Sequence, residues 1–327
     1  MNMAYRPVTH GQAKRRQTPE TPLRLPDWFT RPILADRNTR QITALLRRLR
    51  LNTVCEHARC PNKGECFSNG TATFMILGAV CTRHCRFCAV TAGVPSPVDG
   101  DEPDRLARAA RAMALRYVVV TSVTRDDLAD GGAEQFAAVI RALRRLSPVP
   151  RVEVLTPDFA GNQKALAIVL KEAPDVFNHN IETVPRLYRR LRPEAEYCRS
   201  LDLLRRAKEH HRAVMTKSGI MVGLGERPDE VRAVIRDLRR AGCDILTIGQ
   251  YLSPSSDHYP VKAFITPETF ERYNRLAREE GFRYVSASPL TRSSYQAADL
   301  FRRSTLNDHF QRRTRDEDEH HRQAFRD

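Results

Sequence analysis

The sequence predicts an α/β fold in which helices cover a parallel sheet. Segments rich in β-branched residues alternate with segments of helical periodicity about six times between residues 73 and 286. Turn residues such as Gly131 and Gly132 separate several of these segments. The 327 residues suffice for one large domain or two small ones. Six β–α units are fewer than the eight of a closed barrel, so the pattern fits an open partial barrel or a doubly wound sheet.

Each predicted element follows from its local pattern. The first strand is the apolar run 73–78, and residues 92–103 after it are rich in Pro, Gly and Asp, which predicts a loop. The other predicted strands are short and apolar; they span residues 117–123, 151–155, 175–180, 213–222, 244–249 and 283–286. The predicted helices are amphipathic; they span residues 104–115, 133–146, 164–171, 201–210, 229–240 and 267–280. The carboxyl ends of such strands meet at one edge, where α/β folds place their chemistry.

The two ends of the chain differ from the middle. Residues 1–52 mix Pro, Arg and short apolar stretches, with one possible helix at 39–49, and the charge run at 312–323 is expected to be frayed. No run of 18 or more apolar residues is present, and the N-terminus has no apolar segment typical of a secretory signal. These features predict a cytosolic protein.

The chain is basic. Lys and Arg total 54 against 39 Asp and Glu, a formal net charge of +15. Residues 1–60 hold 12 basic and 4 acidic side chains, so about half of the excess, +8, lies there. This balance favours acidic partners such as nucleic acid, anionic lipid or an acidic protein, and it is equally consistent with an ordinary solvated surface.

The eight cysteines are the most informative residues. Six of them form two triplets within 34 residues, Cys55-x4-Cys60-x5-Cys66 and Cys81-x3-Cys85-x2-Cys88. Clustered cysteines in a cytosolic chain indicate metal binding rather than disulfides. Three close thiolates fit a cuboidal iron–sulfur cluster better than zinc, which usually takes four ligands. Zinc stays an alternative because His57 and His84 lie within the triplets; the isolated Cys198 and Cys243 are predicted to be small core residues.

The second triplet, with Phe87 before its last cysteine, resembles the signature of the radical SAM superfamily. In that superfamily three thiolates hold a [4Fe–4S] cluster and leave one iron open to the amino and carboxylate groups of S-adenosylmethionine (SAM). One electron from the cluster cleaves SAM and forms a 5′-deoxyadenosyl radical. The resemblance favours the partial barrel, a TIM-like (β/α)6 arrangement, over the doubly wound sheet.

The first triplet narrows the resemblance. Residues 55–66 read CEHARCPNKGEC and resemble the auxiliary-cluster motif of the lipoyl synthase family. Further stretches similar to that family follow in order at residues 70–78, 121–132, 177–188, 191–193, 219–226, 249–252 and 292–295. Each stretch is short, but the ordered set covers roughly residues 50–300.

The family resemblance implies three parts of the chain. An N-terminal extension over residues 1–69 carries the auxiliary [4Fe–4S] cysteine motif, and a radical SAM partial barrel spans residues 70–288. Residues 289–327 form a C-terminal segment with an RSSY cluster-ligand motif and a charged tail.

The resemblance also implies a reaction, cofactors and partners. The enzyme would be a sulfurtransferase that inserts two sulfur atoms, at C6 and C8, into an octanoyl group on a lysine of a lipoyl carrier domain. It would use SAM and two [4Fe–4S] clusters, one for radical formation and an auxiliary one consumed as the sulfur source. Expected partners are an octanoylated 2-oxoacid dehydrogenase E2 or glycine-cleavage H protein, an electron donor such as flavodoxin or ferredoxin, and an iron–sulfur carrier. Opposite charge would steer an acidic carrier to this basic chain, whereas no membrane or nucleic-acid partner is expected.

The predicted cluster ligands and catalytic residues are carried over motif by motif. The auxiliary cluster would be bound by Cys55, Cys60 and Cys66, with Ser294 of the RSSY motif as its fourth ligand and Arg292 nearby. The radical cluster would be bound by Cys81, Cys85 and Cys88, which with Ser294 are the predicted catalytic residues. From its local sequence alone, Ser294 would be a serine in a turn or a cap.

The predicted cofactor-binding residues surround the second triplet. The resemblance places Phe87 beside the adenine of SAM, with the stretch 219–226 on the adenine side. The methionine and ribose region would be bound by Ser122, Asn180, Glu182 and Arg192. These four polar residues follow or end predicted strands, where caps and ion pairs are the ordinary alternative.

The sequence departs from the family pattern near its C-terminal motif. Residues 286–291 read SASPLT where the family usually has a Ser-Gly-Pro-Leu-Val run, and Gln296 stands where a His is usual. The departures Ala287, Ser288, Thr291 and Gln296 leave the ligand serine in place and concern packing of the tail and substrate preference.

Two other functions remain open from the residues alone. A related two-cluster enzyme could insert sulfur into, or methylthiolate, RNA or protein, and the basic N-terminal region would then bind phosphate. A non-enzymatic iron–sulfur or zinc protein, such as a nucleic-acid-binding regulator, would leave the β–α repeats without a role.

Overall fold

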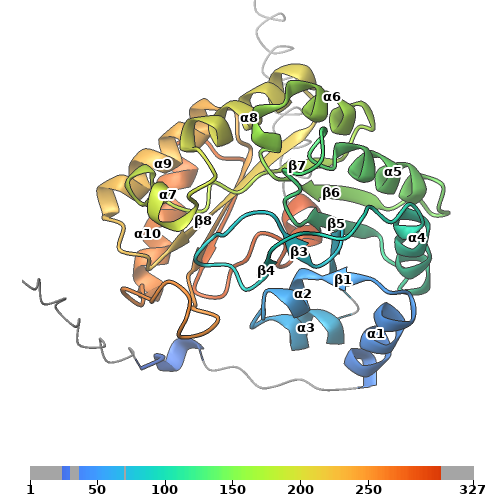
Figure 1. Ribbon diagram of the computed structural model, residues 1–327. Coiled ribbons are helices and arrows are strands. Elements are labelled where there is room, and N and C mark those ends of the chain that lie inside the picture. The colour runs from blue at the N-terminus through green and yellow to red at the C-terminus, as the bar shows by residue number, and fades with distance from the viewer. Residues whose placement is uncertain (1–23, 30–36, 70, 303–327) are drawn as a thin grey trace, which may run out of the picture.

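The computed structural model describes residues 24–29, 37–69 and 71–302, and its centre is an open arc of strands (Figure 1). The main sheet has eight strands, which in spatial order are β1 (Asn52–Thr53), β2 (Thr73–Ile76), β5 (Tyr117–Ser122), β6 (Arg151–Leu155), β7 (Val176–Asn178), β8 (Met215–Val222), β9 (Ile245–Gln250) and β10 (Tyr284–Ser288). β1 runs antiparallel to β2, and every other neighbouring pair is parallel. The sheet keeps two edges, β1 and β10, so the predicted partial barrel is confirmed.

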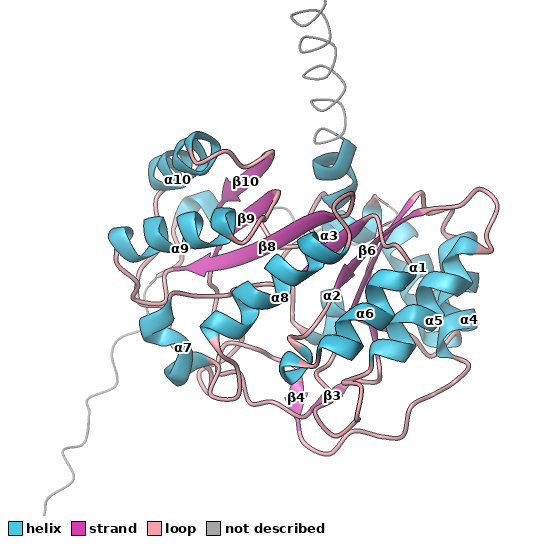
Figure 2. Ribbon diagram, turned by 90° about the horizontal axis from the view of Figure 1, so that it is seen from above, coloured by secondary structure: helices cyan, strands magenta, loops and turns pink. Residues whose placement is uncertain are grey.

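Helices cover the outer face of this sheet and form its crossovers (Figure 2). They are α4 (Glu102–Ala112), α5 (Ala133–Arg144), α6 (Gln163–Lys171), α7 (Pro185–Leu191), α8 (Tyr197–His210), α9 (Pro228–Arg240) and α10 (Pro267–Glu279). Four of the seven have Pro in the first turn, where its missing N–H has no helical partner to lose. Six crossovers join β2 to β5 and then each strand to the next, which confirms the six predicted β–α units.

The elements that the sequence did not predict are short. They are the strands β1, β3 (Val80–Cys81) and β4 (Thr91–Ala92), the helices α2 (Val54–His57), α3 (Lys63–Ser68) and α7, and the 3₁₀ turns η1 (Asp27–Phe29) and η2 (Phe159–Gly161). The predicted strand 175–180 shrinks to β7, although the Asp175 backbone still bonds to both neighbouring strands, with Asp175 N donating to Val152 O and Met215 N donating to Asp175 O. The helix predicted at 39–49 is confirmed as α1 (Arg37–Arg48).

The N-terminal helices share one hydrophobic core with the barrel. Ile42 and Leu46 of α1 and Phe67 of α3 are buried in the same cluster as the barrel residues Phe74 and Val118. The charge run at 312–323 lies outside the described residues. Within the described part of the chain, no helix combines the length and apolar character needed to cross a membrane.

A buried ion pair lies on the inner face of the sheet. Lys217 Nζ on β8 is 2.8 Å from Glu153 Oε1 on β6, and each side chain is 1% exposed. Glu153 Oε2 also accepts from the hydroxyl of Tyr117 at 2.7 Å, and Glu153 Oε1 accepts from Asn178 Nδ2 at 2.9 Å. These four residues come from β5, β6, β7 and β8, so they link the middle strands across the barrel interior.

Candidate functional site

Three thiols gather on the loop that follows β2, here called the loop site. Cys81 ends β3, and Cys85 and Cys88 follow within the loop 81–88. All three line one cavity of about 440 Å³, together with side chains that include Arg86, Arg190 and His258. Burial raises the pKa of Cys85 to about 11 and that of Cys88 to about 12. Thiols in such surroundings become thiolates only when a strong positive charge, such as a metal centre, lies beside them.

Backbone contacts hold this loop on several sides. Arg86 N donates to Leu191 O at 2.9 Å, and Tyr259 N donates to Arg86 O at 2.8 Å. His258 Nε2 lies 3.1 Å from Cys88 O. The end of α7 and the segment after β9 therefore pack on the loop and fix its path.

The other three clustered thiols form a second site, here called the split site, from opposite ends of the chain. Cys55 lies in α2, Cys66 lies in α3 and Cys60 lies in the turn between them. The three cysteines and Ser294 line one cavity of about 270 Å³, which Tyr117 and Arg292 also line. Burial raises the pKa of Cys55 to about 11 and that of Cys66 to about 12. The structure thus brings the predicted fourth ligand to the predicted cysteines across more than 220 residues of chain.

Two hydrogen bonds join the two halves of the split site. Asn62 Nδ2 donates to Leu290 O at 2.8 Å, and the hydroxyl of Tyr295 donates to Glu65 Oε1 at 2.6 Å. Arg292 is half-buried there, and desolvation lowers its pKa while the neighbouring Cys60 opposes that effect. The sequence did not identify individual roles for Asn62, Glu65 and Tyr295. All three lie within the family-like stretches 55–66 and 292–295.

The polar atoms near the loop site fit a bound polar cofactor. Ser122 Oγ, at the end of β5, and Arg192 Nε, just after α7, are buried without a hydrogen-bond partner. Arg192 Nη1 donates to Asn180 O at 3.3 Å, and its charge acts on the Cys85 thiol. Burial raises the pKa of Glu182, against the opposing charge of Arg192. Orphaned buried polar groups are rare, so these atoms indicate a ligand that would satisfy them.

The five predicted SAM-binding residues thus fall into two groups. Asn180 and Glu182 follow β7, and Arg192 follows α7. The three lie together, because Arg192 Nη1 donates to Asn180 O and the charge of Arg192 acts on Glu182. Phe87 is half-buried and packs against the core, and Ser122 ends the neighbouring part of the sheet. None of the five lines the 440 Å³ cavity.

The zinc alternative finds no support among the described residues. In that part of the chain, no three His, Cys, Asp or Glu side chains are arranged to hold a single metal ion. His57 Nε2 pairs with Asn52 Oδ1 at 3.0 Å, and His84 Nδ1 pairs with Glu194 Oε1 at 3.1 Å. A cuboidal cluster asks for a different arrangement, in which each thiolate binds its own iron at one corner and the sulfurs stay apart. Three thiols around one cavity suit that requirement.

The two isolated cysteines behave differently from each other. Cys243 is fully buried, as predicted, and burial raises its pKa. The prediction that Cys198 is a core residue is wrong, because it is exposed in the first turn of α8. The buried residues of that helix are Ser200, Leu203, Leu204 and Ala207, and Cys198 lies off this face.

Comparison with known proteins agrees with this geometry. A model of the Radical SAM superfamily matches residues 75–238, and a model of the N-terminal domain of lipoyl synthase of the Radical SAM family matches residues 5–60. The lipoyl synthase of Caldanaerobacter subterraneus is 55% identical over 84% of this chain and 96% of its own length. The lipoyl synthase of Methylococcus capsulatus is 52% identical over 89% of this chain and 96% of its own length. Among solved structures, SuiB of Streptococcus suis bound to precursor peptide SuiA has a TM-score of 0.52 at 11% identity, covering 77% of this chain and 53% of that one, a likeness of fold alone.

Proposed function

The chain belongs to the lipoyl synthase family of the radical SAM superfamily, and we propose that its loop site and split site hold the two clusters of that reaction. The family function is insertion of sulfur at C6 and C8 of an octanoyl group on a lysine of a lipoyl carrier domain. The alternatives of RNA modification and of a non-enzymatic regulator are not supported, because the curated relatives at 52–56% identity are lipoyl synthases.

Two [4Fe–4S] clusters and SAM are the cofactors of this family, and the residue assignments here rest on the two cavities. Cys81, Cys85 and Cys88 would bind the radical cluster, and Cys55, Cys60, Cys66 and Ser294 would bind the auxiliary one. When bound, the first cluster with SAM supplies the radical that removes hydrogen from the substrate, and the second supplies sulfur.

The protein's own groups position and shield these cofactors. Ser122 Oγ and Arg192 Nε would satisfy polar groups of SAM, and Glu182 and Asn180 lie next to Arg192 for the same task. Phe87 would pack beside the adenine. The observation that carries the proposal is the position of Ser294. This serine lines the same cavity as Cys55, Cys60 and Cys66, although more than 220 residues of chain separate it from them.

The partners follow from the family at a coarser level. The substrate is an octanoylated carrier protein, and we propose that a 2-oxoacid dehydrogenase E2 or an H protein fills this role. A flavodoxin or ferredoxin as electron donor and an iron–sulfur carrier for rebuilding the spent cluster complete the proposal. All eight cysteines are free, which fits a reducing, cytosolic location.

The test is cluster content followed by a single turnover. Full-length protein is reconstituted anaerobically, assayed for iron and sulfide, and mixed with SAM, a reductant and an octanoyl-lysyl peptide. About eight irons per chain with 5′-deoxyadenosine and a doubly thiolated peptide is the expected result. About four irons per chain, or a thiolated product from a Cys55→Ala variant, would overturn the two-site assignment.

A further inference from the structure

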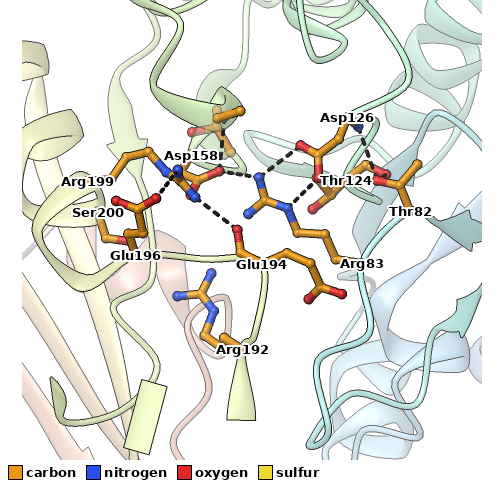
Figure 3. A network of polar contacts seen from close by, with 12 residues as sticks. Thr82, Arg83, Thr124, Asp126, Asp158, Arg192, Glu194, Glu196, Arg199 and Ser200 are labelled. Atoms are coloured by element: carbon orange, nitrogen blue, oxygen red, sulfur yellow. Dashed lines mark hydrogen bonds and ion pairs between the residues drawn. The ribbon is translucent and has the colours of Figure 1, made fainter. Parts of the chain in front are cut away.

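Arg83 lies inside the loop site, between Cys81 and Cys85, yet its side chain is only 4% exposed. Its guanidinium forms a bidentate pair with Asp126, with Nε 2.6 Å from Oδ2 and Nη2 2.9 Å from Oδ1. The same Nη2 donates to Asp158 Oδ1 at 2.6 Å. Figure 3 shows this guanidinium between the two carboxylates. One side chain of the loop 81–88 is therefore fixed to the segments that follow β5 and β6.

The network continues to α8 and comes back to the loop through Glu194, whose Oε1 accepts from His84 N at 3.3 Å. Asp158 is fully buried, and its Oδ2 accepts from Arg199 Nε of α8 at 2.8 Å (Figure 3). Arg199 also donates to Glu196 Oε1 and to Glu194 O. Arg199 thus touches Asp158 at the far end of the network and makes no hydrogen bond to the loop 81–88.

The loop and the segment after β5 are also joined by backbone groups. Thr82 N and Thr82 Oγ1 both donate to Thr124 O at 3.1 Å, and Asp126 N donates to Thr82 Oγ1 at 3.1 Å. Thr124 N points to Cys81 Sγ at 3.3 Å. The Arg83–Asp126 pair closes the other side of this connection, so movement of the loop would break both sets of contacts.

The charges in the inner part of the network balance. Two guanidinium groups, Arg83 and Arg199, face two carboxylates, Asp126 and Asp158, and the exposed Glu196 carboxylate lies at the outer rim. Burial alone would raise the pKa of Asp158, but the hydrogen bonds and charge of Arg83 hold it well below its usual range. A balanced set adds little net charge to the site, and bidentate Arg–carboxylate pairs fix geometry as well as energy. Its contribution is therefore to position the loop.

We propose that Arg83 is a positioning residue that, through Asp126 and Asp158, holds the loop 81–88 in its cluster-binding conformation before any cluster is inserted. The proposal rests on the assignment of Cys81, Cys85 and Cys88 as the radical-cluster ligands. In physical terms, the protein restricts the conformation of the loop without help from a cluster. The three thiols therefore lie close together before iron binds.

The experiment measures hydrogen–deuterium exchange of residues 79–90 and 122–128 in metal-free full-length protein. The variants are Arg83→Gln, Arg83→Lys and Asp126→Asn, and Arg199→Gln is the matched control, since it breaks the same network outside the loop. Arg83→Gln should speed exchange of the Thr82 and Asp126 amides at least tenfold, because the contacts that protect them open locally. Arg83→Lys should give a smaller increase, because an ammonium cannot bind both carboxylates in the fork geometry. Arg199→Gln should raise exchange near the start of α8 and leave Thr82 unchanged.

A second readout follows reconstitution with iron and sulfide. The electron paramagnetic resonance signal of the reduced radical cluster should change on SAM addition in the wild type, and less completely in Arg83→Gln. If Arg83→Gln does not fold, the exchange rates of Arg83→Lys and Asp126→Asn test the proposal instead. Asp126→Asn is expected to fold because Asp126 is only partly buried. Unchanged exchange in these variants, or equal effects of Arg83→Gln and Arg199→Gln on Thr82, would overturn the proposal. The exchange experiment uses metal-free protein, so its result does not depend on SAM cleavage. A wild-type protein that fails to cleave SAM would overturn the proposed function, and the exchange rates would still decide whether Arg83 positions the loop.

Discussion

The loop site and the split site are built in opposite ways. The loop site takes its three thiols from eight consecutive residues, and buried ion pairs of Arg83 tie that loop to the segments after β5 and β6. The split site takes its groups from residues 55–66 and 292–295, and the contacts that join these segments include the Asn62 and Tyr295 hydrogen bonds. A site held by one restrained loop suits a cluster that persists through turnover. A site closed by contacts between distant segments suits a cluster that is dismantled and rebuilt.

Alanine at one cysteine of each site gives the largest expected effect. Cys81→Ala should abolish both SAM cleavage and product, whereas Cys55→Ala should retain SAM cleavage and yield no lipoyl group. Ser294→Ala should resemble Cys55→Ala, because it also disturbs the sulfur donor. The measurement is 5′-deoxyadenosine and thiolated peptide by mass spectrometry in one reaction.

Cys198→Ala is the control for this pair, since Cys198 is exposed and touches neither cavity. It should leave both products at wild-type amounts. Loss of SAM cleavage in Cys55→Ala would mean that SAM cleavage at the loop site depends on the split site. That result would contradict the separate roles given to the two sites.

The buried ion pair of Lys217 and Glu153 gives the next largest effect. Lys217→Met removes the partner of a fully buried Glu153, which also orients Tyr117 on the wall of the split site. Leaving that carboxylate unpaired should lower the free energy of unfolding by about 3–5 kcal/mol. Chemical denaturation measures this loss.

Lys164→Met is the matched control, because Lys164 is exposed on α6. It should change the free energy of unfolding by no more than about 0.5 kcal/mol. A double variant, Lys217→Met with Glu153→Met, should recover much of the loss, since no buried charge is left without a partner. A Lys217→Met protein as stable as the wild type would show that the pair does not hold the strands together.

A substitution at Gly249 tests how closely the segment that carries Ser294 must pack on β9. A Cβ on Gly249 would lie 2.1 Å from Thr291 O, so Gly249→Ala must push the segment that carries Arg292 and Ser294 away from β9. Displacement of a reacting group by about 1 Å can reduce a rate about 100-fold. We expect sulfur insertion to fall by about that factor while SAM cleavage continues. Gly100→Ala is the control, because nothing lies within 4 Å of its Cβ.

The sequence predicted the loop site more completely than the split site. Neighbouring cysteines, strand ends and β–α alternation are local patterns, so the six β–α units and the thiol loop follow from them, whereas the family resemblance was needed to choose the partial barrel over a doubly wound sheet. The approach of Ser294 to Cys55 depends on long-range folding, and only the family resemblance predicted it. Arg83 and Asp158 were missed as a pair because their partnership joins segments 75 residues apart. The signal that could have found them is a charged residue just after a predicted strand, as Asp158 follows β6.

The smallest expected effect is a pH dependence of the free energy of unfolding. It comes from His179, a histidine on the side of the loop site. His179 is fully buried just after β7, where its Nδ1 lies 2.8 Å from Thr156 O and its Nε2 lies 3.0 Å from Ser200 Oγ. Burial, with the charge of Arg192, lowers its pKa to about 4. The unfolded chain binds this proton near pH 6.5 and the folded chain does not, so the folded state loses stability as the pH falls from about 6.5 towards 4.

The slope of this loss is at most about 1.4 kcal/mol per pH unit. Urea unfolding of the full chain at pH 7.5, 6.5, 5.8 and 5.2 measures it, and His179→Gln should flatten it over that range. His210→Gln, at an exposed histidine of α8, should retain the wild-type slope. A His179→Gln protein with the wild-type slope would place the acid sensitivity elsewhere. A flattened slope would trace the acid sensitivity of the fold to His179, a buried group whose pKa the charge of Arg192 also lowers.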